Sequence, residues 1–168
     1  MIEVPLSNSD RVALIDNADE ELVCAHRWWM IESPSPVRPS FYARGLVIGQ
    51  RYQPLMHRLL MDQMTDHVNG NGLDNRRVNL RPATRSQNGG NRRKAVATGS
   101  RFKGVTPYIG HPGRWLAYIT LNKSKRHLGI FDDEAVAGRA YDDAARSLFG
   151  EFAALNFPEV GERGALIV

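Results

Sequence analysis

The chain has 168 residues, of which 42% are hydrophobic and 24% are charged, and its formal net charge is +4 at pH 7. This length allows one domain or two small ones, and no apolar run reaches the ~18 residues that a membrane span requires. Cys24 is the single cysteine, which excludes an internal disulfide or a thiolate zinc cluster within one chain and indicates a reducing compartment.

The first segment, residues 1–53, is expected to be rich in short strands. Extended stretches are predicted at 11–15, 28–31 and 41–48, where aromatic and aliphatic residues alternate or cluster. The chain starts Met-Ile-Glu-Val-Pro-Leu, which is acidic where a secretion signal is basic, so we expect a cytoplasmic protein that is not secreted. Residues 1–40 carry seven acidic side chains against three basic ones, and the sequence leaves the role of this acidic excess open.

A short helix and a strand-turn pattern follow. Pro54 suits the first turn of a helix, and the apolar residues after it recur at helical spacing: Leu55, Met56, Leu59 and Leu60. Residues 65–72 are predicted to form a strand that runs into a tight turn, because the sequence Asn-Gly-Asn-Gly at its end tolerates positive φ. An extended piece at 80–83 and a helix capped by Thr84 and running to about Arg93 complete the order strand, strand, helix.

The pattern changes in the second half of the chain. Residues 95–100 are small and polar, as in a flexible linker. Three strands are predicted at 102–106, 115–121 and 127–131. A helix with an alanine-rich apolar stripe follows them, capped by Asp133 and ended by Gly150. We therefore expect a second small domain here.

The basic residues are concentrated in one part of the chain. Residues 76–127 carry thirteen Lys and Arg and no Asp or Glu. Like charges repel one another unless a polyanion neutralises them, so this segment predicts a nucleic-acid partner.

Asp66 and His67 open the segment that carries the most chemical information. A carboxylate, an imidazole and several amides lie among arginines, and these groups can hold a divalent metal, activate water and bind a polyanion. Asn79 follows His67 by twelve residues, and Asn88 follows nine residues later. With these spacings, the run D-H-V-N-G-N-G-L-D-N-R-R-V-N-L-R-P-A-T-R-S-Q-N resembles the HNH endonucleases of phage and intron origin whose third position is Asn.

The resemblance implies a ββα-metal fold that holds one divalent cation. Asp66 and Asn88 would ligate it through oxygen, which suits Mg²⁺ or Mn²⁺. His67 would be the general base that activates water, and Asn79 would fix the loop or orient His67. Successive strand residues point to opposite faces, so Asp66 and His67 must flank the phosphate from two sides or lie at the bend before Asn69.

His57 and a group of arginines are further candidates around this motif. His57 lies in Met-His-Arg-Leu-Leu, where it would touch DNA, assist the site as an accessory residue or pack within its helix. The arginines would neutralise backbone phosphates and make binding depend steeply on salt; they are Arg76, Arg77, Arg81, Arg85, Arg92 and Arg93.

Residues 101–158 contain a second set of motifs. They run F-K-G-V-T-P-Y, G-R-W-L-A-Y-I, K-R-H-L-G-I-F-D, A-G-R-A-Y-D-D-A-A-R-S-L-F-G and L-N-F-P. This pattern resembles the plant ethylene-response-factor (APETALA-type) DNA-binding domain, which implies a three-stranded antiparallel sheet in the major groove, backed by one helix. The matching contact positions, with two neighbouring arginines, are Lys103, Thr106, Tyr108, Arg114, Tyr118, Thr120, Lys125, Arg126 and His127. Several differ in type from the plant residues, so the plant target sequence is not expected.

These features predict an α+β protein. It would combine a ββα-metal (HNH) nuclease module with a small three-stranded antiparallel sheet and one packed helix. The expected organisation is a β-rich segment at 1–53, the HNH core at 54–94, a linker at 95–100, the DNA-binding domain at 101–158 and a tail at 159–168.

The predicted function is a metal-dependent, homing-type HNH DNA endonuclease that acts in a bacterial or phage-infected cell. It would hydrolyse phosphodiester bonds of double-stranded DNA at a site chosen by its C-terminal domain. We expect it to act as a monomer or homodimer and to have no membrane partner. One alternative is a sequence-specific DNA-binding regulator with little or no nuclease activity, although Asp66, His67 and Asn88 are intact. Another is an RNA-binding or RNA-cutting protein, although a major-groove reader suits B-form DNA better than RNA.

Overall fold

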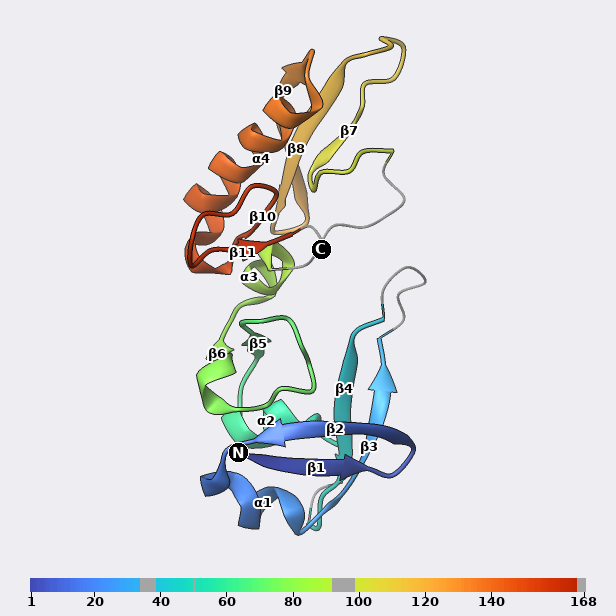
Figure 1. Ribbon diagram of the computed structural model, residues 1–168, viewed down its shortest axis with the longest axis vertical. Helices are drawn as coiled ribbons and strands as arrows, with labels where there is room; N and C mark the ends of the chain where they lie inside the picture. The colour runs from blue at the N-terminus through green and yellow to red at the C-terminus, as the bar shows by residue number, and fades with distance from the viewer. Residues whose placement is uncertain (34–38, 50, 92–98, 166–168) are drawn as a thin grey trace. The chain divides into compact units, whose positions relative to one another are not determined.

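A computed structural model describes residues 1–33, 39–49, 51–91 and 99–165 of the chain (Figure 1). Short helices and small sheets follow one another along it, which confirms the predicted mixture of α and β structure. In these ranges no helix is long and apolar enough to cross a membrane. The chain divides into two compact units, residues 1–84 and 85–168, and each has a buried apolar core.

Two antiparallel hairpins form most of the first unit. β1 (Ile2–Leu6) pairs with β2 (Ser9–Ile15), and β3 (Arg27–Glu32) pairs with β4 (Phe41–Leu46). Between the hairpins lie a 3-10 turn, η1 (Asn17–Asp19), and α1 (Glu20–Cys24). The three predicted strands of this segment are confirmed, whereas β1 and α1 escaped the sequence analysis because β1 contains a proline and α1 is only five residues long.

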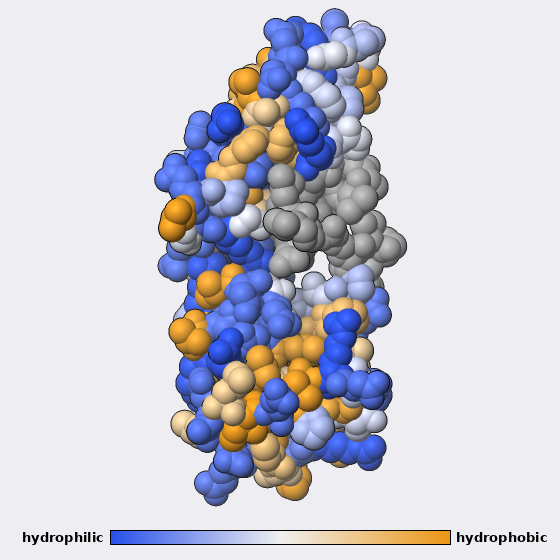
Figure 2. Space-filling view, viewed as in Figure 1, coloured by the Kyte–Doolittle hydropathy of each residue, from blue (hydrophilic) through white to orange (hydrophobic). Residues whose placement is uncertain are grey.

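Trp28 is the centre of the first core. Its indole Nε1 donates a hydrogen bond to the Val23 carbonyl at 2.8 Å, and only 2% of the residue is exposed. A Cβ on Gly45 would clash with the Trp28 ring, so the close approach of the two strands requires glycine at that position. Hydrophobic residues also reach the visible surface of this unit (Figure 2), and its exposed large side chains include Leu46 and Ile48.

The rest of the first unit follows the predicted order of helix, strand and strand. α2 (Met56–Met61) is followed by β5 (Thr65–His67), which pairs antiparallel with β6 (Leu80–Pro82), and η2 (Arg77–Asn79) leads into β6. Pro54 lies before α2 rather than in its first turn, because its carbonyl accepts a hydrogen bond from Gly45 N at 3.1 Å.

The second unit is a three-stranded antiparallel sheet with a helix packed on one face (Figure 1). Its strands are β7 (Val105–Pro107), β8 (Trp115–Leu121) and β9 (Ser124–Phe131), and its helix is α4 (Glu134–Phe149). Asp133 caps α4 by accepting a hydrogen bond from Val136 N at 2.8 Å, and Gly150 ends it, as predicted. Alanines 137 and 145 are fully buried, which allows the helix to lie close to the sheet.

The ends of the second unit differ from the sequence-based boundaries. α3 (Arg85–Gly90) falls in this unit and not in the preceding one. Of the expected linker at 95–100, residues 95–98 lie outside the described residues. The expected tail is folded as far as it is described, since β11 (Arg163–Gly164) pairs parallel with β10 (Ala154–Leu155), after η3 (Gly150–Phe152).

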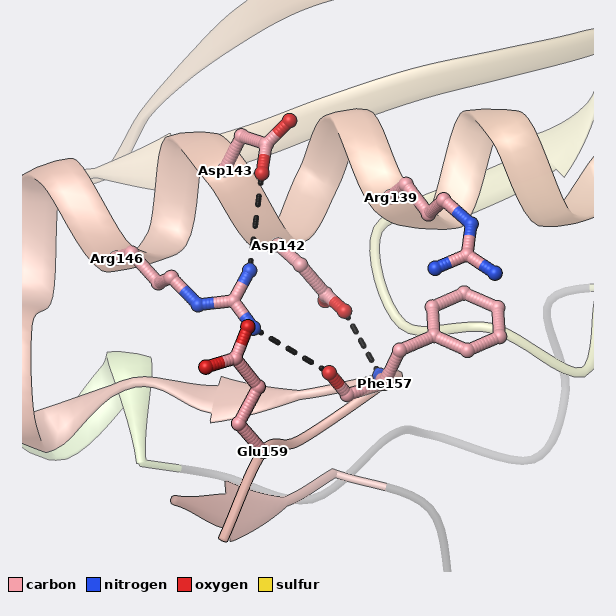
Figure 3. A pocket seen from close by; sticks show the side chains of 6 residues that line it. All are labelled: Arg139, Asp142, Asp143, Arg146, Phe157 and Glu159. Atoms are coloured by element: carbon pink, nitrogen blue, oxygen red, sulfur yellow. Dashed lines mark hydrogen bonds and ion pairs between the residues drawn. The ribbon is translucent and has the colours of Figure 1, made fainter. Parts of the chain in front are cut away.

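Asp142 connects α4 to the segment that follows it. Its buried carboxylate accepts hydrogen bonds from the backbone N–H groups of Asn156, at 2.8 Å, and Phe157, at 2.7 Å. Figure 3 shows the second of these. Arg139 lies over the Phe157 ring, 4.5 Å from its centre, on the outer side of the same helix. The Asp142 carboxylate therefore accepts the hydrogen bonds of two consecutive backbone N–H groups in place of backbone carbonyls.

We expect Asp142→Asn to lower the free energy of unfolding of the second unit by about 1–3 kcal/mol, because an amide NH₂ would then face a buried backbone N–H. Urea denaturation measures this loss. Asp143→Asn is the matched control, since the Asp143 side chain is 80% exposed and pairs with Arg146 at 3.6 Å. The control should change the free energy by less than about 0.5 kcal/mol, and equal effects of the two variants would contradict the role of Asp142.

Candidate functional site

The β5–β6 hairpin carries the first two residues of the predicted motif. Asp66 lies opposite Arg81 and His67 lies opposite Leu80 in the strand register. Both Asp66 and His67 are buried, and as successive strand residues they point to opposite faces of the hairpin. His67 is the last residue of β5, and its carbonyl accepts a hydrogen bond from Gly70 N at 2.8 Å. The bend therefore begins directly at His67.

Arg81 holds the Asp66 carboxylate. The Nε and one terminal nitrogen of its guanidinium approach Asp66 Oδ2 at 3.1 and 2.9 Å, and only 13% of the Arg81 side chain is exposed. Arg81 was predicted to contact a backbone phosphate; in the structure its guanidinium pairs with Asp66 inside the hairpin. Arg81 both orients Asp66 and partly neutralises it.

Asn79 fixes the loop between the two strands. Its Oδ1 accepts a hydrogen bond from Asn69 N at 2.9 Å, and its Nδ2 donates to the Asp74 carbonyl at 2.7 Å. A single side chain thus ties the start of the loop to its middle. The sequence left open whether Asn79 fixes the loop or orients His67. These hydrogen bonds correspond to fixing the loop.

Asn75 is the residue that hydrogen-bonds to His67, and the sequence analysis missed it in this role. Asn75 is fully buried, and its Oδ1 lies 3.3 Å from His67 Nε2. Its Nδ2 donates to the Leu73 carbonyl at 3.2 Å, which fixes the amide orientation and makes Oδ1 the atom that faces His67. With the amide in this orientation, the hydrogen bond pairs the Asn75 oxygen as acceptor with His67 Nε2 as donor.

Two aromatic rings pack around His67. The His57 ring meets it edge-on, with ring centres 4.9 Å apart and an interplanar angle of 88°. Tyr42 lies beside both rings, with ring centres at 5.9 and 6.0 Å. His57 is buried, and its Nδ1 has no hydrogen-bond partner among the described residues. Burial, followed by the neighbouring His67 and Arg58, lowers the pKa of His57 to about 3, so this ring is neutral at physiological pH.

Arg76 and Arg77 also pair with carboxylates of their own unit. Arg76 makes two hydrogen bonds of 2.7 Å to Asp74, and these, helped by Asn69, hold the pKa of Asp74 below its usual value. Arg77 binds the buried Asp19 at 2.6 Å. Both arginines were also predicted to bind backbone phosphates, which remains a prediction; in the structure they pair with carboxylates of the first unit. Asp19 is one of the acidic residues of 1–40 whose role the sequence left open, and its role in the structure is to pair with Arg77.

Asn88 and the remaining arginines of the motif lie beyond the first unit. Asn88 is half-buried in α3 of the second unit, and the exposed Arg85 is the first residue of that helix. Arg92 and Arg93 lie outside the described residues. The structure therefore groups Asp66, His67 and Asn79 in the first unit and describes Asn88 in the second.

The donor atoms of Asp66 and Asn88 fit a hard cation. No cluster of three or more His, Cys, Asp or Glu side chains that could hold a metal occurs in the described parts of the chain. Zinc sites use three or four such ligands, whereas Mg²⁺ keeps several waters and takes one or two protein oxygens. A carboxylate and an amide oxygen are donors of the kind that Mg²⁺ or Mn²⁺ takes.

The face of the β7–β9 sheet away from α4 carries five of the predicted contact residues. Ala117 and Ile119 are buried toward α4, so Tyr118 and Thr120 point to the opposite face. Tyr118 pairs with His127 and Thr120 with Lys125, and residues directly opposite each other share a face. Thr106 joins them through its pairing with Leu116. We call Thr106, Tyr118, Thr120, Lys125 and His127 the outer-face residues.

Lys125 is held in place on this face. Its ammonium lies 4.2 Å from the centre of the Tyr118 ring, which is a cation–π contact. The strand register puts Arg126 opposite Ile119, off the outer face but on an exposed part of β9.

The other predicted contact residues of this unit have partners of their own. Tyr108 stacks on His111 in the β7–β8 turn, with ring centres 4.9 Å apart, and Arg114 pairs with Asp132 at 2.7 Å. Lys103 turns inward, and its ammonium donates to the Gly90 carbonyl at 2.6 Å. Lys103 was predicted to contact DNA, and this inward direction of its ammonium gives the residue a different role in the fold.

Comparison with known proteins finds two kinds of relative. An uncharacterized HNH endonuclease of Acanthamoeba polyphaga mimivirus is 30% identical over 138 residues, which are 80% of this chain and 69% of the viral protein. An AP2/ERF and B3 domain-containing protein of Oryza sativa subsp. japonica is 47% identical over 64 residues, or 38% of this chain. APETALA2-like protein 2 of Oryza sativa subsp. indica is 45% identical over 60 residues.

The plant matches are local. This chain spans only 17% of the first rice protein and 13% of the second. No protein-family model matches the chain.

His57 gives a prediction for the pH dependence of stability. Its pKa falls from 6.5 to about 3 on folding, so the unfolded chain binds a proton that the folded chain does not bind in this interval. Stability must then decrease as the pH falls below 6.5. We expect His57→Phe to lose stability less steeply than the wild type between pH 6.5 and about pH 4, as measured by urea denaturation. Identical slopes would contradict a neutral, buried His57.

Proposed function

Because the chain belongs to the HNH endonuclease family, we propose that it is a metal-dependent DNA endonuclease of the homing type. It would hydrolyse a phosphodiester bond of double-stranded DNA to 5′-phosphate and 3′-hydroxyl ends. The observation that best supports the proposal is the hydrogen bond between buried Asn75 and His67, because an imidazole that donates from Nε2 to Asn75 would use Nδ1 as its basic atom.

His67 would act as the general base. Its Nδ1 would accept a proton from the attacking water, while Nε2 keeps its proton in the hydrogen bond to Asn75. The imidazolium that forms would have its positive charge stabilised by the Asn75 oxygen. Tyr42 and the neutral ring of His57 would confine the imidazole without competing for the proton.

Asp66 and Asn88 would hold one Mg²⁺ or Mn²⁺ through oxygen. The bound cation would stabilise the charge that develops on the phosphate and on the leaving 3′ oxygen. Arg81 would keep the Asp66 carboxylate oriented from across the hairpin. Asn79 would keep the loop of residues 68–79 closed, so that Asn75 stays in contact with His67.

The second unit would choose where the DNA is cut. Support comes from the local similarity to plant AP2/ERF proteins and from the outer-face residues, which combine a cation, an aromatic ring and hydroxyl groups. Such a strand surface can read base edges in the major groove, while Arg126 and Arg85 would neutralise phosphates.

Two other functions make different predictions. A DNA-binding regulator without nuclease activity would bind DNA and leave it intact in the presence of Mg²⁺. An RNA-directed protein would release DNA when RNA competes for it. A cleavage assay and a competition assay on the same preparation therefore separate the three functions.

We expect His67→Ala to slow Mg²⁺-dependent DNA cleavage by about 10²–10⁴-fold, the usual contribution of a general base. Asn75→Ala should slow it by roughly 10–100-fold, because the imidazole loses its orienting partner. Both variants should bind DNA as the wild type does. Single-turnover cleavage and filter binding measure the two properties, and undiminished cutting by the His67 variant would overturn the assignment of the base.

We expect Lys125→Ala to weaken DNA binding and to reduce by about one the slope of log affinity against log salt, because one phosphate contact is lost. Arg139→Ala is the matched control, since it removes a positive charge from α4, on the other side of the sheet. Fluorescence anisotropy across a salt series gives both slopes. Equal changes in the two variants would show that only net charge matters.

A further inference from the structure

Lys103 has an environment that a surface DNA contact would not have. Its ammonium donates to the Gly90 carbonyl at 2.6 Å and approaches the Ala154 carbonyl at 3.4 Å. Burial, followed by the charge of Arg163, lowers its pKa to about 7. A lysine whose ammonium is this strongly desolvated points into the protein.

The backbone of Lys103 is fixed by hydrogen bonds, as its ammonium is. The backbone N–H of Lys103 donates to Asn156 Oδ1 at 2.6 Å, and Asn156 Nδ2 returns a hydrogen bond of 3.0 Å to the Lys103 carbonyl. The ring of Tyr141, a buried residue of α4, lies 5.5 Å from the ammonium. Lys103 is therefore anchored to the core of the second unit at both ends.

The group that Lys103 holds is the end of α3. Gly90 is the last residue of this helix, and a Cβ built on it would lie 2.6 Å from the ring of Phe149 in α4. Asn91, directly after it, donates its N–H to the Gln87 carbonyl at 3.0 Å. Close packing against Phe149 and the hydrogen bond from Lys103 thus attach α3 to the second unit at the same residue.

We propose that Lys103 is a positioning residue for Asn88: by holding the Gly90 carbonyl, it fixes α3, and with it the proposed metal ligand, on the body of the recognition unit. The role of Asn88 in this inference rests on the proposed function. The attachment of α3 by Lys103 does not depend on that function. Asn88 lies two residues before Gly90 in the same helical turn, so a displacement of the helix end displaces Asn88. A long side chain that ends in a hydrogen-bond donor suits this place because the last carbonyls of a helix have no partner within the helix.

Lys103→Met keeps the length of the side chain and removes its donors, so it tests the proposal. In full-length protein we expect faster hydrogen exchange of the Asn91 amide and an increase of about tenfold in the Mg²⁺ concentration for half-maximal cleavage. DNA affinity measured without Mg²⁺ should stay within about twofold of the wild type, since no contact with DNA is lost. Lys125→Met is the control, and it should weaken DNA binding and leave the Mg²⁺ requirement unchanged.

A double-mutant cycle connects the two residues. In an Asn88→Ala background, Lys103→Met should have no further effect on the Mg²⁺ requirement, because the ligand that it positions is already absent. Additive effects would overturn the positioning role. A loss of DNA affinity with an unchanged Mg²⁺ requirement would do the same and would make Lys103 a phosphate contact.

The attachment of α3 can also be tested without cleavage. If the wild type does not cut DNA, the proposed function fails, while unchanged exchange of the Asn91 amide in Lys103→Met would refute the attachment itself. If that variant does not fold, NMR of the wild type decides. Scalar coupling across the hydrogen bond from Lys103 Nζ to the Gly90 carbonyl carbon is expected, and its absence would overturn the inference.

Discussion

Residues 72–75, between β5 and β6, can be buried only because their polar groups find partners, and the orientation of His67 depends on that condition. A buried amide without a hydrogen bond costs about 1–3 kcal/mol, so an irregular segment inside a protein has to satisfy each one. The backbone N–H of Asn75 donates to the Leu14 carbonyl at 2.8 Å, and Leu14 N donates to the Leu73 carbonyl at the same distance. Strand β2 thus supplies the pairing that the loop lacks, and Asn75 Oδ1 is left facing the imidazole.

Charge in this protein is partly used for folding. Thirteen basic residues without an acid between 76 and 127 indicate a polyanion partner, but Arg76, Arg77 and Arg81 each pair with a carboxylate of the first unit. Taking Arg77 to a phosphate would leave Asp19 buried and unpaired, which is strongly destabilising. For the proposed function, the side chains better placed to contact DNA are exposed ones that do not pair with a carboxylate, such as those on the outer face of the β7–β9 sheet.

The sequence predicts the second unit better than it predicts the contacts of the site. The observed limits of β8, the Asp133 cap and the Gly150 end of α4 follow from periodicity and local chemistry. Asn75 escaped prediction because it sits among turn-forming residues and its importance comes from Leu14, which is distant in sequence. The direction of Lys103 could not be predicted because a family pattern assigns a position and not a side-chain direction, and here the ammonium donates to the Gly90 and Ala154 carbonyls.

A motif that is continuous in sequence is thereby divided between two folded bodies. Asp66, His67 and Asn79 are fixed by the hydrogen bonds of the first unit, whereas the helix of Asn88 ends against Phe149 and Lys103 in the second. Substitutions in the core of the second unit should therefore displace Asn88 and leave the hydrogen bonds of the first unit unchanged. In the proposed function, the residue assigned as the second metal ligand is thus fixed by the core of the second unit and not by the hairpin that carries Asp66 and His67.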